Sequence, residues 1–387
     1  MQLLRYRRSA RIESGEWLDR VRTATRIRRK VFLRPPLIYS TKTSDDQLMK
    51  GMDMSELKSS ENGMSFSEKW VSYRSAIKVL DCTVRDGGLM NDHKFTDDVV
   101  RAVYDAVCDA GIDYMELGYK ASTKIFSPDQ FGTWKFCRED DIRRLIGKKK
   151  KSVKLSVMAD ADRTDYHTDI LPRDKSILDM IRVATYIHQI PSAIDMIKDA
   201  HDKGYETTVN LMAVSTVPEL ELNEALGLLV KSPVDYIYVV DSFGSLYSEH
   251  VQYLMKKYLK YAESTGKQIG MHAHNNQQLA FANTIEAIIL GANILDGSMA
   301  GLGRGAGNCS IELLLGFLHN PKFKLRPILN CIQNYIEPMR KDLMWGYDVP
   351  YMLTGVLNQH PRAAIKFNAS EDRGNLTKFF DSIIGED

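Results

Sequence analysis

Short apolar runs rich in Val, Ile and Tyr alternate with longer amphipathic stretches from Ile77 onwards. The amphipathic stretches carry apolar residues three and four positions apart, as a helix with one buried face requires, and several end in Gly. Eight runs have the length of a strand: 77–84, 113–119, 153–160, 181–188, 207–214, 236–244, 268–274 and 292–301. Eight strands, each followed by a helix, predict an α/β fold of the closed (β/α)8 TIM-barrel type. A doubly wound parallel sheet is the alternative.

The same pattern divides the chain into three predicted segments. Residues 71–320 hold the eight strand-and-helix units and form the predicted barrel domain. Residues 321–387 continue with helix-like stretches and predict a helical C-terminal region. Residues 1–70 show little periodicity, and their first half carries ten Arg and one Lys against three acidic residues. They predict a basic, disordered extension, with an organellar transit peptide or a later start methionine as alternatives.

Composition excludes several classes of protein. The fractions of hydrophobic (44%) and charged (26%) residues are ordinary for a globular protein. No apolar run approaches the length of about 18 residues that a membrane-spanning helix needs. Five cysteines, an odd number, argue against a disulfide scaffold and predict a reducing, cytoplasmic location. The four lysines at 148–151 precede the third strand and indicate a solvated loop, so no nucleic-acid partner is expected.

Reactive groups of a (β/α)8 barrel lie at the carboxyl ends of its strands. His272 and His274 are two positions apart on the seventh strand, so their side chains point the same way. Asp86 follows the first strand, and only strand eight separates strands one and seven around a closed barrel. Two imidazoles and a carboxylate form a facial ligand set with open coordination positions. The three residues therefore predict a metal site; histidines that hydrogen-bond without a metal are the alternative.

Arg85 lies beside Asp86 at the end of the first strand. A guanidinium next to a bound metal can stabilise an oxyanion such as an enolate. An ion pair with Glu116, at the end of the second strand, would instead make Arg85 a supporting residue. The two interpretations are compatible.

Two further features leave alternatives open. Lys120 could form a Schiff base with a carbonyl substrate, although the polar residues that follow it favour a solvated loop. The glycine-dense segment 301–308 follows the last strand and ends in Asn308. It could bind a phosphate, but a tight turn that brings Asn308 to the metal or its water is the favoured interpretation.

Five segments, taken in order, resemble a known superfamily: LDCTVRDGG, MELGY, VVDSFG, MHAHNN and SMAGLGRGAGN. The superfamily is that of the HMG-CoA lyase-like (HMGL-like, DRE-TIM) metal-dependent aldolases and Claisen-type lyases and synthases. The resemblance spans about residues 77–320 and is closest to 4-hydroxy-2-oxovalerate aldolase. It implies a divalent metal on Asp86, His272 and His274, with Asn308 as a further ligand or close neighbour. Mn²⁺ or Mg²⁺ suits an open site with oxygen-rich substrates, and two imidazoles leave Zn²⁺ or Co²⁺ as alternatives.

The resemblance also implies roles for other residues. Arg85 would stabilise the enolate, and Glu116 would support it. The aldolases place a catalytic His three residues after the metal-binding Asp, and this chain has Leu89 there. The general base is therefore open, with His188 and Tyr347 among the candidates; His93 and Tyr119 are the other two. Tyr347 lies in a WGY segment that resembles one lending a tyrosine to the active site.

The resemblance predicts an enzyme that makes or breaks a carbon–carbon bond through the enolate of a pyruvate-type 2-oxo acid. The expected partners are a 2-oxo acid and an aldehyde, with a homo-oligomer and an aldehyde-consuming dehydrogenase as further expectations. One alternative is a Claisen-type enzyme that uses an acyl-CoA on the same metal site. The other is a barrel that has lost catalysis and serves as a binding partner.

Overall fold

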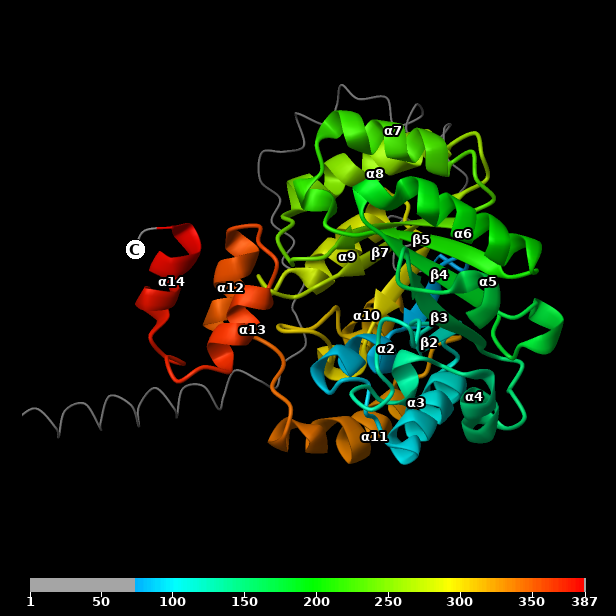
Figure 1. Cartoon of the computed structure of the whole chain (residues 1–387), viewed down its shortest axis with the longest axis horizontal. Helices are drawn as coiled ribbons and strands as arrows, with labels where there is room; N and C mark the ends of the chain where they lie inside the picture. The colour runs from blue at the N-terminus through cyan, green and yellow to red at the C-terminus, as the bar shows by residue number, and fades with distance from the viewer. Residues whose placement is uncertain (1–73, 386–387) are drawn as a thin grey trace, which may run out of the picture. The chain divides into compact units, whose positions relative to one another are not determined.

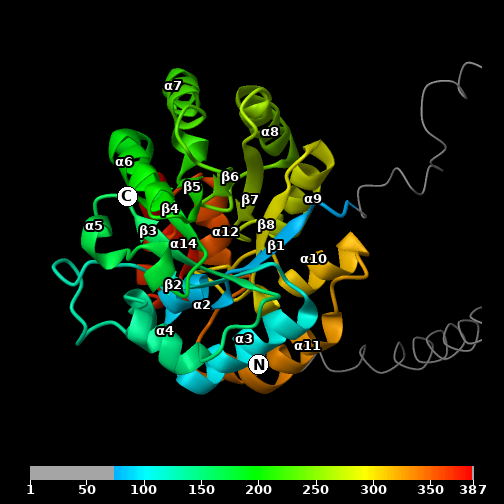
Figure 2. The same ribbon diagram turned by 90° about the vertical axis from the view of Figure 1, so that its right-hand side faces the viewer.

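Eight parallel strands close on one another in sequence order, and helices surround them (Figure 1 and Figure 2). The computed structural model describes residues 74–385. Its strands are β1 (Lys78–Asp81), β2 (Tyr114–Tyr119), β3 (Lys154–Asp160), β4 (Met180–Thr185), β5 (Glu206–Leu211), β6 (Tyr236–Asp241), β7 (Gln268–Ala273) and β8 (Ile294–Gly297). β1 closes the barrel by pairing with β8, from Lys78 opposite Ile294 to Asp81 opposite Gly297. The predicted (β/α)8 barrel is confirmed, and the predicted extension 1–70 lies outside the described residues.

The outer helices bury the apolar stripes that the sequence pattern predicted. α3 (Asp97–Ala110) buries five valine, cysteine and tyrosine side chains and ends at Gly111, whose φ of 75° is the left-handed cap conformation. The other outer helices are α4 (Glu139–Ile146), α6 (Ile190–Asp202), α7 (Glu219–Leu229), α8 (Ser248–Ala262), α9 (Ala280–Leu290) and α10 (Ile311–Leu318). Within residues 74–385, none of the helices combines the length and apolar character that crossing a membrane requires.

Several strands end earlier than predicted, and this changes how the site is built. β1 stops at Asp81, and a short helix, α2 (Thr83–Gly87), follows directly. Arg85 and Asp86 therefore lie on one helical turn, where neighbouring side chains diverge by about 100° rather than pointing to opposite faces. The fourth predicted strand likewise ends at Thr185, and His188 lies in the short 3-10 helix η7 (Ile187–Gln189).

Inside the barrel, the even-numbered strands contribute two stacked layers of four side chains. The lower layer is mostly apolar and consists of Tyr114, Met180, Tyr236 and Ile294. The layer above it, two residues further along each strand, is polar and consists of Glu116, Arg182, Tyr238 and Asp296. The Arg182 guanidinium lies 4.6 Å from the Tyr238 ring centroid. A charged layer in the barrel interior therefore supports the carboxyl ends of the strands.

A bulge in β2 brings one more side chain to the same side. Glu116 pairs with Ser156 and Tyr119 pairs with Met158, so three steps along β2 match two steps along β3. The extra residue reverses the alternation, so Tyr119 faces the barrel mouth above Glu116. Gly118 allows this because a Cβ there would lie 1.9 Å from the carbonyl oxygen of Trp134.

The C-terminal region is helical, as predicted. Its elements are α11 (Leu325–Cys331), η10 (Ile332–Ile336), η11 (Glu337–Lys341), α12 (Val349–Val356), α13 (Arg362–Asn368) and α14 (Leu376–Ile384). α12, α13 and α14 lie at one end of the barrel (Figure 1 and Figure 2). The Asn276 amide donates to the Tyr351 carbonyl (3.1 Å), and Ser245 donates to Asn358 (2.8 Å). These helices are thereby attached to the loops that follow β6 and β7.

Asp81 stabilises the turn that leads from β1 into α2. Its fully buried carboxylate accepts hydrogen bonds from the Thr83 backbone N–H (3.1 Å) and hydroxyl (2.7 Å). The Thr83 hydroxyl in turn accepts from the backbone N–H of Met299 (2.9 Å), after β8. Burial raises the pKa of Asp81 from 3.8 to about 7.

This raised pKa predicts a pH-dependent stability. Between pH 3.8 and about 7 the folded state retains a proton that the unfolded state releases, so stability falls as the pH rises through this window. Asp81→Asn keeps an acceptor for the Thr83 N–H and cannot ionise. We expect the variant to be more stable relative to wild type at pH 8 than at pH 5. Its free energy of unfolding in urea denaturation, minus that of wild type, should therefore be larger at pH 8. A difference that is independent of pH would contradict this account.

Candidate metal centre and active site

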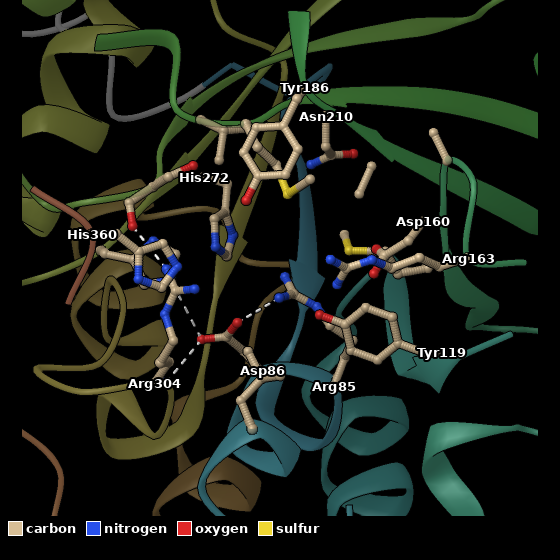
Figure 3. A pocket seen from close by; sticks show the side chains of 18 of the residues that line it. Arg85, Asp86, Tyr119, Asp160, Arg163, Tyr186, Asn210, His272, Arg304 and His360 are labelled. Carbon is tan, nitrogen blue, oxygen red and sulfur yellow. Dashed lines mark hydrogen bonds and ion pairs between the residues drawn. The ribbon is translucent and has the colours of Figure 1, made fainter. Parts of the chain in front are cut away.

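A cavity of about 550 Å³ opens at the carboxyl ends of the strands (Figure 3). Its wall includes Arg85 and Asp86 from α2, His272 and His274 from the end of β7, and Arg304 from the loop after β8. The C-terminal region adds His360 and Arg362. The volume lies within the usual range for small-molecule sites.

Asp86, His272 and His274 offer ligand atoms that lie within 4.8 Å of one another. All three side chains are buried. Figure 3 shows the His272 ring and the Asp86 carboxylate facing the same space. The structure therefore brings together the three residues that the sequence pairs as metal ligands.

Hydrogen bonds fix which nitrogen of each imidazole faces this space. His274 Nδ1 donates to the Asp241 backbone carbonyl (3.0 Å), and His272 Nδ1 lies 2.9 Å from the Asp296 carboxylate. The Nε2 atoms of both rings are buried and have no hydrogen-bond partner in residues 74–385. Burial lowers the pKa of His274 to about 3, so its ring is neutral. The neutral His274 ring thus presents an unshared lone pair at Nε2, as a metal ligand does, and the unpartnered Nε2 of His272 lies beside it.

Asn308 lies beside the three predicted metal ligands and contacts Asp86. Its Nδ2 donates to Asp86 Oδ2 (2.8 Å), whereas its buried Oδ1 has no partner in the described part of the chain. Gly303 lets the loop approach closely, because a Cβ there would lie 2.4 Å from Asp86 Oδ2 and 2.3 Å from Asn308 Nδ2. The glycine-dense segment is therefore a tight turn against the site. Among the described residues, the two imidazole Nε2 atoms and Asn308 Oδ1 are thus acceptors without a hydrogen-bond partner, and they lie beside the Asp86 carboxylate. A divalent cation would bind all of them.

A continuous chain of buried charges runs beneath the site from Asp86 to His272. Arg85 donates to Asp86 and, through Nε, to Glu116 Oε2 (2.7 Å). Arg182 donates to the same Glu116 oxygen (2.8 Å) and to Asp296 (2.6 Å). Asp296 is the carboxylate that orients His272. Three carboxylates against two guanidiniums leave one surplus negative charge, which favours a cation at the site.

The charge chain also holds Arg85 in its ionised form. Burial opposes the charge on Arg85, but Glu116 and Asp86 outweigh it and raise the pKa of Arg85 well above its ordinary value. Burial likewise opposes ionisation of Asp86, and Arg85 outweighs it and lowers the pKa of Asp86. Arg85 lines the cavity, and its Nη2 makes no hydrogen bond to another described residue. This nitrogen can therefore donate to a bound oxyanion.

Of the remaining predicted site residues, some line the cavity and others do not. His188 and Tyr119 line the cavity, and the His188 ring stacks on Tyr186 at a centroid distance of 5.9 Å. Glu116 is fully buried beneath the cavity and contacts it only through Arg85. Tyr347 is 61% exposed and lines a separate cavity with Trp345, because the segment after η11 leaves the barrel mouth.

Two other candidates, His93 and Lys120, are not among the residues that line the cavity. His93 is buried against Gly88 and Tyr119, with a centroid distance of 5.3 Å to the tyrosine ring. Lys120 is buried rather than solvated, and its Nζ donates to the Cys137 carbonyl (2.8 Å). Covalent catalysis by Lys120 therefore has no support in the structure.

Some residues that line the cavity are not predicted by the sequence pattern. Asp160, at the end of β3, follows the same strand-end rule as the residues that were found, and the rule could have identified it. Lys135 and Arg163 lie in the loops after β2 and β3, where no pattern marks them. His360 and Arg362 reach the cavity only through the packing of the C-terminal helices.

Comparison with known proteins shows the family. The model of the family described as HMGL-like matches residues 76–331, and the chain belongs to this family. An oxaloacetate decarboxylase from Mycobacterium tuberculosis is 31% identical over 62% of this chain and 69% of that protein. A 4-hydroxy-2-oxovalerate aldolase from Moorella thermoacetica is 27% identical over 76% of this chain and 88% of that protein. The prediction of a carbon–carbon lyase or aldolase is confirmed at the level of the family.

Solved structures agree with this membership. The N-terminal domain of a protein described as an aldolase, from Bacteroides vulgatus, is 28% identical with a TM-score of 0.65, and 78% of this chain covers all of it. HMG-CoA lyase from Brucella melitensis, at 17% identity and a TM-score of 0.56 over 69% of this chain and 99% of that one, shows the shared fold.

Removing Arg182, the central residue of the buried charge chain, should reduce stability more than removing an exposed ion pair. Arg182→Met leaves Glu116 and Asp296 buried with only one partner each, and we expect it to lower the free energy of unfolding by roughly 3–5 kcal/mol. Arg144→Met, which removes an exposed ion pair with Asp97, is the matched control and should change stability little. Urea denaturation measures both. Equal effects would mean that the buried chain contributes no more than a surface pair.

Proposed function

We propose that this chain is a divalent-metal-dependent lyase that makes or breaks the C3–C4 bond of a 2-oxo acid through the enolate of a pyruvate-type product. The convergence of Asp86, His272 and His274, with two orphaned Nε2 atoms, is the observation that supports this proposal most. Two of the relatives named above, the oxaloacetate decarboxylase and the 4-hydroxy-2-oxovalerate aldolase, act on 2-oxo acids by their names. The same site chemistry serves both an aldol cleavage and a decarboxylation.

Asp86, His272 and His274 would hold the metal, with Asn308 as a further ligand through its Oδ1. When bound, a divalent cation supplies Lewis-acid stabilisation of charge on substrate oxygens. Mn²⁺ or Mg²⁺ suits the oxygen donors, and Zn²⁺ or Co²⁺ remains an alternative because of the two imidazoles.

The chain's own residues would do the rest. Arg85 donates a hydrogen bond from its Nη2–H to the enolate oxygen, and its pairing with Glu116 keeps this donor oriented before the substrate arrives. Asp296 and the Asp241 carbonyl hold the two imidazoles in the tautomer that faces the site. His188 takes the proton from the 4-hydroxyl group in an aldol cleavage, since it lines the cavity. Burial raises the pKa of Tyr119, so its phenol stays protonated and suits donation of a proton rather than its removal. Decarboxylation gives the same enolate without this proton transfer.

The proposal extends to the cellular context. All five cysteines are unpaired and buried, which supports a reducing, cytoplasmic location. The aldehyde product of an aldol cleavage would pass to a dehydrogenase partner, and the protein would assemble as a homo-oligomer. Both belong to the proposal and rest on the resemblance to 4-hydroxy-2-oxovalerate aldolase.

The direct test combines metal binding with enolate formation. Wild-type protein should bind roughly one Mn²⁺ per chain and exchange the methyl protons of pyruvate in heavy water only when the metal is present. Asp86→Asn, which keeps the shape of the side chain, should weaken metal binding by more than about 100-fold and abolish exchange. Metal analysis and proton NMR measure the two effects.

Asp160→Asn is the matched control, because it removes a cavity carboxylate that lies outside the ligand group and should leave metal binding intact. Absence of any metal binding would overturn the proposal. Metal binding without exchange of pyruvate protons would instead favour an acyl-CoA substrate or a barrel without catalysis.

The proton-transfer step predicts a difference between two substrates. His188→Gln, which removes the proposed base, should slow cleavage of 4-hydroxy-2-oxovalerate by about 100-fold or more. The same variant should slow decarboxylation of oxaloacetate far less, because that reaction takes no proton from a hydroxyl group. Measuring the release of pyruvate from each substrate provides the comparison. Equal losses on both substrates would assign the residue to substrate binding.

A further inference from the structure

Lys135 is a buried cation that the proposed chemistry does not use. It ends the short 3-10 helix η5 (Thr133–Lys135), in the loop after β2, and only 7% of it is exposed. Its side chain nevertheless lines the cavity that contains the metal-binding group. No carboxylate within residues 74–385 lies at ion-pair distance from its Nζ. Buried lysines are rare unless they are paired, so this one requires a reason.

Three aromatic rings surround the Lys135 ammonium. Its Nζ lies 4.3 Å from the ring centroid of Phe126, 4.5 Å from that of Tyr119 and 5.6 Å from that of Phe131. Cation–π interactions stabilise the charged form and hold the group in place, but they supply no hydrogen-bond acceptor. The ammonium is thus positioned as a donor whose acceptor must come from the cavity.

Two other charged groups lie in the same part of the cavity wall. Asp160 ends β3, and Arg163 follows it by three residues. Figure 3 shows both on the side of the cavity away from Arg304 and His360. In the described chain, neither forms an ion pair with the other or with Lys135. The three groups, which we call the β2–β3 charge cluster, therefore surround space without neutralising one another directly.

We propose that the β2–β3 charge cluster binds a second carboxylate of the substrate, so that the enzyme acts on 2-oxo acids with an anionic group distal to the keto group. This inference rests on the proposed function, because the keto acid end would occupy the metal-binding group. The metal-binding side chains come from α2, β7 and the loop after β8. A substrate that starts there and extends towards β2 and β3 reaches Lys135 and Arg163 with its other end.

The net charge of the β2–β3 charge cluster suits a ligand with one carboxylate at this position. Lys135 and Arg163 contribute two positive charges and Asp160 one negative charge, which leaves a single positive charge to match one carboxylate. Burial lowers the pKa of Lys135, while Asp160 opposes this effect. The cation–π contacts favour the ammonium over the neutral amine that a Schiff base would need, so a binding role fits the surroundings better than covalent catalysis.

Two ligands of equal length isolate the second carboxylate. 2-Oxoglutarate and 2-oxovalerate each contain five carbons and differ in whether the far end is a carboxylate or a methyl group. Calorimetric titration of Mn²⁺-loaded protein should show binding of 2-oxoglutarate about tenfold tighter or more, since a charge-assisted hydrogen bond contributes about that much. Lys135→Met keeps the apolar stem between the three rings and should abolish this preference.

Three further variants complete the experiment. Arg163→Gln, at an exposed position, should reduce the preference without a risk to folding. Lys124→Met removes a solvent-exposed lysine of the same loop that pairs with Asp165, and it should leave the preference unchanged. Arg362→Met tests the opposite wall. A preference lost in Arg362→Met and retained in Lys135→Met would overturn the inference.

The inference and the proposed function fail in different ways. Equal affinity of wild type for both ligands would overturn the inference and leave the proposed function standing. Failure of both 2-oxo acids to bind the metal-loaded protein would overturn the proposed function, and the inference with it. Thermal unfolding of Lys135→Met distinguishes a loss of binding from a loss of folding. If Lys135→Met does not fold, the affinities of Arg163→Gln for the two ligands test the inference instead.

Discussion

The buried charge chain from Asp86 to His272 is the interaction on which the proposed site depends. Each ion in it has lost its hydration, a cost of several kcal/mol that only close pairing offsets. Because every member pairs with its neighbours, none can rotate alone without leaving a buried charge unpaired. Both ends of the chain are proposed metal ligands, so the geometry of the site and the ion pairs beneath it are fixed together.

This arrangement concentrates polarity where most barrels bury apolar side chains. The layer of Glu116, Arg182 and their neighbours replaces branched apolar residues directly above an apolar layer that includes Tyr114 and Met180. An apolar layer of the same volume would stabilise the fold at least as well. The charged layer is therefore explained better by what it orients, namely Arg85 and His272, than by its contribution to folding.

Periodicity and strand-end chemistry predict the barrel and the group of Asp86, His272 and His274. The barrel follows from the repeated strand-and-helix pattern, and the group follows because strands one and seven lie close together around a closed barrel. The sequence does not reveal the helical turn of α2 or the bulge at Gly118, which place Arg85 and Tyr119 in the mouth. These depend on close approaches to distant residues, such as the Trp134 carbonyl. Tyr347 illustrates the same limit: a motif at the right place in the chain lies outside the cavity, while His360 enters it.

The Leu89 position bears on which reaction the cavity favours. Leu89 lines the cavity and is 37% exposed, so an apolar side chain occupies the wall where related aldolases are expected to have a histidine. An aldol cleavage needs a base at the hydroxyl oxygen, and the proposed base in this cavity is His188, in η7 after β4. A decarboxylation has no such need. The presence of Leu89 in η4 (Gly88–Met90) therefore leaves the distinction between the two reactions to the side chains that follow β4.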